Sequence, residues 1–269
     1  MVVFAGQGDA RRSIPLLWRA DSSAESTADV RTTPGPRPGL SVDAIVDAAI
    51  ALADEHGMAA LSMRAVGERL GCTAMALYTY VPGKGELVDL MYDRVMAELA
   101  TGHDPAAGWR PALRSWAGQV WEFHLRHPWT LQVSQARPVL GPNEYGVLET
   151  LAGILRGTGL PPRVLRGIVG VLVNFVRGAA QTIADARQAT AATGMSDQEW
   201  WSARAALLEQ VAPGLAQRFP MAAWLHSDAA PAPEDATTPY LERDARRNFD
   251  TGLAVLLDGI EAAMTGAAR

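Results

Sequence analysis

The sequence predicts an all-α fold in two parts, a set of three short helices followed by a larger helical bundle. Apolar residues recur three and four positions apart through most of the 269 residues, which is the spacing of an amphipathic helix. Ser, Thr and Gly stand where those helices would begin and end, and no alternating strand pattern extends beyond a few residues. We place a flexible arm at residues 1–39, the three-helix part at 40–100 and the bundle at 101–269.

The composition limits the class of protein. Hydrophobic residues make up 48% of the chain, enough for a sizeable core. Cys72 is the single cysteine, which excludes an intramolecular disulfide and a cysteine-based zinc site. The N-terminus lacks a signal-peptide pattern, and the most apolar run, residues 168–176, is about half as long as a bilayer-crossing helix. We therefore expect a cytoplasmic protein without a membrane partner.

Local signals place the three short helices. The first is expected over residues 41–57 with Ser41 as its N-cap, the second over 62–71 with Ser62 as its N-cap, and the third over 73–80. Two short helices joined by a tight glycine turn are typical of a helix-turn-helix unit, which places its second helix in the major groove of DNA.

The third helix carries no charge, and small or aromatic side chains occupy its outward positions. Such a face allows close approach to another surface. Ala and Thr methyl groups can meet thymine methyls, while Tyr and Thr hydroxyls can bind phosphates or bases. Leu77 and Val81 are expected to face inward. Lys84 begins the next long helix, where its charge is unfavourable unless a phosphate binds nearby.

The net charge opposes DNA binding at first sight. Residues 40–100 carry four Lys or Arg against nine Asp or Glu, a formal charge of −5, whereas a nucleic-acid-binding unit usually has a basic surface. Arg31 and Arg37 lie on an arm that prolines at 34, 36 and 38 keep extended, and they are candidates for minor-groove or phosphate contacts. The alternative is an inert, disordered arm, especially over residues 1–30, although the apolar group at 14–18 could dock on the body.

The segment IVDAAIALADEHGMAALSMRAVGERLGCTAMALYTYVPGKGELVDLMYDRV resembles the DNA-binding domain of the TetR family of bacterial repressors. The shared pattern is a small polar cap at Ser62, a hydrophobic-Arg-x-hydrophobic helix start, a glycine turn at Gly71, and LYTYVPGK at residues 77–84. The resemblance covers roughly sixty residues with its turns in register, which is more specific than a lone helix-turn-helix pattern.

The resemblance implies a role for each residue in this pattern. The expected DNA-binding residues are Ser62 and Arg64 for the DNA backbone, Thr73, Ala74, Met75 and Ala76 for the bases, Tyr78, Tyr80 and Lys84 for phosphates, and Arg37 on the arm. The chain departs from the commonest family pattern because its base-reading positions hold almost no strong hydrogen-bonding side chain. Arg64, the arginine arm and DNA shape are therefore expected to supply specificity.

Beyond residue 101 we expect helices at 111–126, 128–135, 142–156, 161–189, 197–212 and 240–264, with a Pro-rich acidic loop before the last. FHLRHPW and the following GPN resemble the TetR subgroup with a tetracycline-repressor-like C-terminal domain, found in antibiotic-producing actinobacteria. In that family two helices from each subunit form a four-helix dimer interface, which spaces the reading helices about 34–36 Å apart. Small residues on two helices fit this role, and a close crossing within one chain is the alternative. They are Gly167, Gly170, Gly178, Ala179, Gly252, Val255, Gly259 and Ala263.

The interior of the bundle is the expected small-molecule site, because apolar walls with a few polar groups are typical of ligand pockets. The candidate ligand-binding residues are Trp116, Trp121, Trp129, Gln132, Asn174, Phe175 and Gln181. Each one taken singly is as readily explained by core or surface packing. His124 and His127 are spaced for a metal but lack an evident third ligand, so we predict neither a metal site nor a cofactor.

These expectations describe a homodimeric repressor that binds an inverted-repeat DNA operator and is released by a small lipophilic or antibiotic-like effector, controlling an efflux or biosynthetic gene. An activator or dual regulator on the same fold is the nearest alternative. A helical small-molecule-binding protein or enzyme is less well supported, because we find no Gly-rich phosphate loop, nucleophile elbow or recognisable carboxylate pair, and we expect no catalytic residues.

Overall fold

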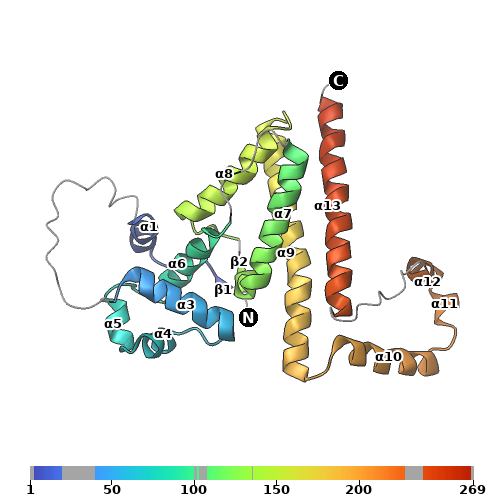
Figure 1. The fold of residues 1–269 in the computed structure, drawn as a ribbon, viewed down its shortest axis with the longest axis horizontal. Helices are drawn as coiled ribbons and strands as arrows, with labels where there is room; N and C mark the ends of the chain where they lie inside the picture. The colour runs from blue at the N-terminus through green and yellow to red at the C-terminus, as the bar shows by residue number, and fades with distance from the viewer. Residues whose placement is uncertain are drawn as a thin grey trace. The chain divides into compact units, whose positions relative to one another are not determined.

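A computed structural model describes residues 3–19, 40–99, 102, 108–134, 136–227 and 239–267. Within these residues the regular structure is helical apart from one pair of two-residue strands, so the all-α prediction is confirmed (Figure 1). The chain divides into two compact units, Met1–Arg177 with Leu256–Arg269, and Gly178–Val255.

The three predicted short helices are α3 (Val42–His56), α4 (Met63–Leu70) and α5 (Ala74–Tyr78). Ser41 and Ser62 cap α3 and α4 as expected, since each hydroxyl accepts a hydrogen bond from a backbone N–H three residues later, at 3.1 Å. Gly71 ends α4 with a left-handed φ of 68°, which a residue without Cβ adopts freely. Thr73 occupies the N-cap position of α5, but its side chain makes no capping hydrogen bond.

Helix α6 (Lys84–Met96) is shared between the short helices and the bundle. It packs against α3 and also against α8 (Pro142–Arg156), which in turn packs on α7 (Trp109–Arg126) (Figure 1). Most of α6 is buried, including Leu87 and Met91 at 0% exposure. A displacement of α6 therefore disturbs both sets of contacts.

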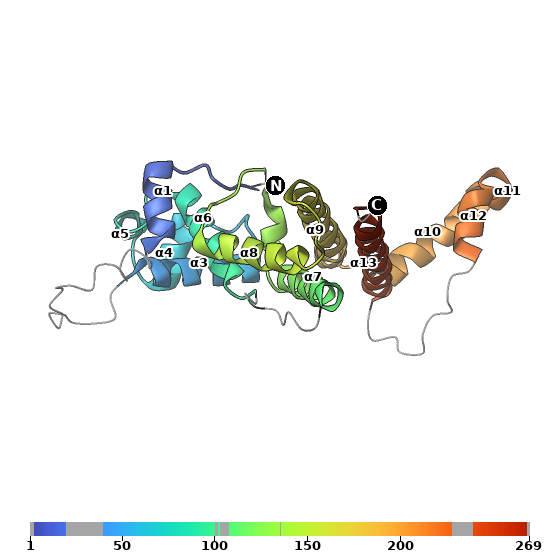
Figure 2. The same cartoon turned by 90° about the horizontal axis from the view of Figure 1, so that it is seen from above.

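The first residues of the chain form structure that the sequence analysis did not predict. Strand β1 (Val3–Phe4) pairs in parallel with β2 (Val133–Ser134), and α1 (Ala10–Leu17) packs beside α6 (Figure 2). The prediction of a flexible arm is wrong for residues 3–19, because Asp89 and Glu86 of α6 accept backbone hydrogen bonds from Gly6 and Asp9. The apolar group at 14–18 does dock, with Leu17 buried. Arg31 and Arg37 lie outside the described residues.

The helix expected at 128–135 is also corrected. Residues Pro128–Gln132 form a 3₁₀ helix, η2, and the next two residues are strand β2. Arg177 explains this, because its guanidinium donates hydrogen bonds to the carbonyls of Thr130, Leu131 and Val133 and so competes with a longer helical ladder.

Two long helices, α9 (Pro162–Thr193) and α13 (Tyr240–Ala267), contribute residues to both units. By length and composition alone α9 could cross a membrane, a test that core helices of soluble proteins also pass. The second unit also holds α10 (Asp197–Val211), α11 (Leu215–Arg218) and α12 (Pro220–Ser227), none of which has a buried residue. Proline and glycine at 213, 214 and 220 obscured α11 and α12 in the sequence pattern.

Candidate nucleic-acid interface and ligand cavity

Helix α5 presents an uncharged face to solvent. Met75 is 75% exposed, and Tyr78 and Tyr80 are exposed as well, whereas Leu77 and Val81 are fully buried as predicted. Seven of the predicted DNA-binding residues are exposed, namely Ser62, Arg64, Thr73, Met75, Tyr78, Tyr80 and Lys84. Ala74 and Ala76 are half-buried, and Arg37 lies outside the described residues. The structure therefore gathers nine of the ten on α4, α5 and the start of α6.

A glycine sets the position of α5 against α4. A Cβ atom added to Gly67 would lie 2.8 Å from the carbonyl oxygen of Cys72 and 3.2 Å from the amide nitrogen of Ala74. Both atoms are backbone, so a larger residue would push the turn and α5 away from α4. The role of Gly67 is not visible in the sequence, because a glycine inside a helix gives no sign of what lies beside it.

The nine acidic residues among the described residues 40–99 are buried or paired. Glu86, Asp89 and Asp93 are buried on α6. At the surface Glu68 pairs with Arg64 at 2.8 Å, and both oxygens of Glu55 bind the guanidinium of Arg69. Exposed ion pairs of this kind contribute little to stability because water and salt screen them, so a phosphate can compete for either arginine.

Lys84 is exposed at the start of α6, but its Nζ donates a hydrogen bond to the carbonyl oxygen of Leu61 at 2.6 Å. This bond anchors α6 to the segment that precedes α4. An ammonium group has three donors, so two remain for a phosphate.

A cavity of about 390 Å³ lies among α6, α7, α8 and α9. Its walls are largely apolar, with Leu99, Val120 and Leu151 among them, and its polar side chains include His124 and Glu144. Burial raises the pKa of the Glu144 carboxyl, as does the nearby Asp93, against the lowering effect of its backbone hydrogen bonds. A largely apolar cavity with few polar groups suits a small molecule with a ring system.

The seven predicted ligand-binding residues do not form one site. Trp116 lines the cavity. Trp121 and Trp129 are core residues, and the Trp129 indole donates to Asp54 at 2.8 Å. Asn174 is exposed, whereas Gln132, Phe175 and Gln181 are half-buried and do not line this cavity. Their positions on α9 and η2 face other directions, which an aromatic or amide count along the sequence does not reveal.

His124 is a buried, neutral side chain on the cavity wall. Its Nδ1 lies 2.9 Å from the hydroxyl of Thr130. Burial lowers the pKa of His124 to about 3, with smaller contributions from the positive charges of Arg177 and His127. The imidazole therefore carries no charge near neutral pH.

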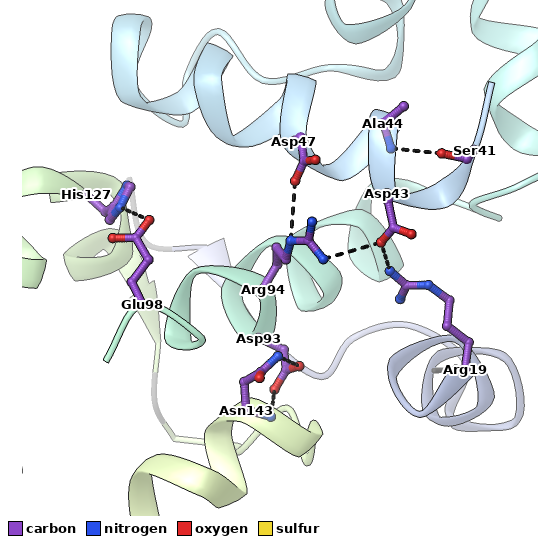
Figure 3. Close-up of polar contacts among 10 residues, drawn as sticks. All are labelled: Arg19, Ser41, Asp43, Ala44, Asp47, Asp93, Arg94, Glu98, His127 and Asn143. Carbon is purple, nitrogen blue, oxygen red and sulfur yellow. Dashed lines mark hydrogen bonds and ion pairs between the residues drawn. The ribbon is translucent and has the colours of Figure 1, made fainter. Parts of the chain in front are cut away.

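Asp93 and Arg94 of α6, with Glu98 just after its end, make polar contacts to α8, to α3 and to the residue that follows α7 (Figure 3). Asp93 accepts hydrogen bonds from the backbone N–H groups of Asn143 and Glu144 at 3.0 and 2.9 Å, which caps α8. Gly141 permits this cap, because its Cβ would overlap the Asp93 carboxylate at 2.1 Å. Burial raises the pKa of Asp93 above that of an ordinary aspartate.

The other two residues, Arg94 and Glu98, face α3 and the end of α7. Arg94 pairs with Asp43 and Asp47 at 3.5 and 3.4 Å, and Glu98 binds Nε2 of His127 at 3.0 Å (Figure 3). The Nδ1 atom of the same imidazole lies 2.8 Å from Asp54 of α3.

Burial disfavours the charged form of His127, but its hydrogen bonds and charge interactions with Asp54 and Glu98 outweigh burial and raise its pKa. Sequence reasoning treated His127 only as a weak metal candidate and did not assign a role to Asp93 or Arg94. The acidic residues at 86, 89 and 93 were a usable signal, because they share one face of a helix that is otherwise buried.

Comparisons with known proteins agree with this architecture. A family model described as bacterial regulatory proteins of the tetR family matches residues 45–91, and one described as the tetracyclin repressor-like C-terminal domain matches residues 101–264. The HTH-type transcriptional repressor DrrR1 of Streptomyces coeruleorubidus is 37% identical over 263 residues, which cover 96% of this chain and 87% of that protein. An HTH-type transcriptional regulator of Saccharopolyspora erythraea is 30% identical over 142 residues, 53% of this chain and 60% of that protein.

Solved structures show the same fold. Apo ActR from Streptomyces coelicolor superposes with a TM-score of 0.68 at 24% identity, covering 87% of this chain and all of that one. ActR in complex with actinorhodin gives a TM-score of 0.67 at 25% identity, with 84% and 98% coverage. These relatives are regulators of transcription rather than enzymes. The chain therefore belongs to the TetR family of bacterial transcriptional regulators.

Proposed function

We propose that this chain represses transcription by binding an inverted-repeat operator as a homodimer, and that an apolar, ring-containing molecule in the cavity releases it from DNA. The observation that carries this proposal is the position of α6, which borders the cavity through Tyr92 and Met96 and packs on α3. The regulated gene is expected to encode an exporter of that molecule or an enzyme of its biosynthesis.

The face of α5 supports the DNA-binding part of the proposal. Its exposed side chains are apolar or hydroxylated, and Arg64 with an 85% exposed side chain stands on the neighbouring α4. Such a surface can approach a groove without the desolvation cost of a charged helix, while Tyr and Arg hold the phosphates.

Open glycines on α9 and α13 support a dimer. A Cβ added at Gly167, Gly170 or Gly259 would meet no described atom within 4 Å, so a close crossing within the chain does not explain them. Only 22% of the most apolar window of α9 is buried. The exposed apolar remainder also suits burial against a second subunit. A dimer would give the two α5 helices the spacing of one DNA turn.

The comparisons support control by a ligand. ActR, which shares the fold, has been crystallised with actinorhodin, and DrrR1 is a repressor. A molecule in this cavity would change the packing of α6 on α8, and so bias the protein toward a conformation that fits the operator poorly.

Substituting Met75 with Glu tests the DNA interface. The side chain is 75% exposed, so folding is expected to be unaffected, while a carboxylate on α5 would repel the phosphates. We expect operator affinity to fall at least about tenfold, or 1.4 kcal/mol, in a fluorescence anisotropy titration with the inverted repeat from the protein's own promoter.

Gln119→Glu is the matched control, because it adds the same charge at an exposed position of α7. It should leave the affinity within twofold. Equal affinity for Met75→Glu and wild type would show that α5 does not contact the operator.

A further inference from the structure

The tautomer of His124 is fixed by its neighbour Thr130. The Thr130 hydroxyl donates its single proton to the carbonyl oxygen of His127, at 2.6 Å. It can therefore only accept a hydrogen bond from His124, whose Nδ1 lies 2.9 Å away. Nδ1 thus carries the proton, and Nε2 of the neutral ring is left with a free lone pair.

This free nitrogen is the polar group that His124 offers to the cavity. His124 lines the cavity and is only 3% exposed, whereas Thr130, which occupies Nδ1, does not line it. Among the described residues no donor reaches Nε2. Nε2 therefore makes no hydrogen bond to the described residues, and a bound molecule with a donor would supply one.

The cavity offers no positive charge to an anion. The described residues that line it include neither Lys nor Arg, and the Glu144 carboxyl adds a second acceptor. Arg177 is not among them and is occupied by three backbone carbonyls. The indole N–H of Trp116 is a buried donor without a partner in the described part of the chain and also belongs to the lining, but it carries no charge. A carboxylate ligand would enter an apolar space without a counter-charge, which is strongly disfavoured.

We infer that Nε2 of His124 accepts a hydrogen bond from the effector. The cavity therefore selects a ring system that carries a hydroxyl donor over the same ring system without that hydroxyl, and over the same ring system with a carboxylate in its place. This inference rests on the proposed function, because it names the chemical class that the cavity takes as effector. Phenolic polycycles satisfy it: the rings fill the apolar walls and one hydroxyl meets His124.

Three probes of the same ring size test the selection. 2-Naphthol has the donor, 2-methoxynaphthalene lacks it, and 2-naphthoate replaces it with an anion. In titrations followed by tryptophan fluorescence or calorimetry, wild-type protein should bind 2-naphthol roughly tenfold more tightly than 2-methoxynaphthalene, and 2-naphthoate most weakly.

The variant His124→Phe should bring the ratio of the two uncharged probes to about one, because the ring remains and the acceptor is lost. His226→Phe, at an exposed position of α12, should keep the wild-type ratio. A hydroxyl preference that persists in His124→Phe would overturn the inference, and so would failure of wild-type protein to bind 2-naphthol.

The tautomer itself can be measured in the intact wild-type protein. A long-range proton–nitrogen correlation spectrum of histidine-labelled protein shows which ring nitrogen is protonated, and we expect Nδ1 for His124. Protonation at Nε2 would overturn the inference even if His124→Phe does not fold.

Operator binding by the same samples separates the two proposals. Wild-type protein that binds the operator but shows no hydroxyl preference counts only against the inference on His124, whereas wild-type protein that binds no promoter duplex counts against the proposed function.

Discussion

Replacing His127 with Gln should weaken the connection between the end of α7 and the DNA-binding helices. The imidazole, whose side chain is 10% exposed, bonds to Asp54 at 2.8 Å and to Glu98 at 3.0 Å. A hydrogen bond to a charged group contributes about 1.5–3 kcal/mol. The two carboxylates are 27% and 44% exposed, so the lower end applies. Gln can retain one bond, which gives an expected loss of about 1.5 kcal/mol in the free energy of unfolding.

The directions of the two pKa shifts predict how the stabilisation by His127 and Glu98 changes with pH. The pKa of His127 is raised in the folded protein, so its contribution is complete below the unfolded value, about 6.5, and is lost as pH rises through the folded value. Burial raises the pKa of Glu98, but the opposing hydrogen bonds and charges of His127 and Arg126 lower it overall. Its contribution is complete above about 4.3 and is lost as pH falls through the folded value. The pair should therefore stabilise most between about pH 4.3 and 6.5.

Urea unfolding of wild type and His127→Gln at several pH values, with the protomer concentration held fixed, measures this difference. We expect about 1.5 kcal/mol at pH 6 and a smaller difference as pH rises toward 9. His56→Gln is the control, since that side chain is 60% exposed and 3.7 Å from Glu55, and it should change stability by less than about 0.5 kcal/mol. A pH-independent difference for His127→Gln, or one no larger than the control, would refute the reasoning.

Three further predictions concern other parts of the molecule. Gly67→Ala should displace the α4–α5 turn, and so reduce operator affinity at least about tenfold and destabilise the protein by about 1–3 kcal/mol. The control Gly118→Ala lies on α7, where a Cβ meets nothing within 4 Å, and should stabilise the protein by up to about 1 kcal/mol. Equal stabilities of the two variants in urea unfolding would contradict the role of Gly67. Arg177→Met leaves backbone carbonyls without their donor and should cost about 3 kcal/mol in urea unfolding, and a loss below about 1 kcal/mol would show that water replaces the guanidinium. The double substitution Arg31→Ala with Arg37→Ala removes up to four arginines from the proposed dimer and should lower the magnitude of the slope of log affinity against log salt by up to about four; an unchanged slope would show that the arm is inert.

The local parts of the fold were predictable from sequence because their signals are local. Ser41, Ser62 and Gly71 determine where α3 and α4 begin or end, and each acts through atoms within a few residues of itself. The uncharged face of α5 followed in the same way from residues 73–80, none of which carries a charge. These signals, together with their spacing, were sufficient to indicate the family.

The contacts between distant segments were not predictable in this way. The docking of residues 3–19 depends on Asp89 and Glu86, which are more than 70 positions away. The cavity is lined by residues from four helices, and sequence alone does not give the rotation of each helix, so of the seven candidates only Trp116 was placed correctly against it. His124 and His127, weighed as metal ligands, instead contact Thr130 and two carboxylates.

The central claim, that occupation of the cavity releases DNA, is tested most directly by one paired titration. Operator affinity is measured by fluorescence anisotropy for wild type and for Val173→Trp, which fills part of the cavity, with and without a hydroxylated polycycle that wild type binds. We predict that the compound weakens operator binding by wild type at least about tenfold and has little effect on the filled variant. A compound that occupies the wild-type cavity and leaves operator affinity unchanged would contradict the account, as would equal release of both proteins.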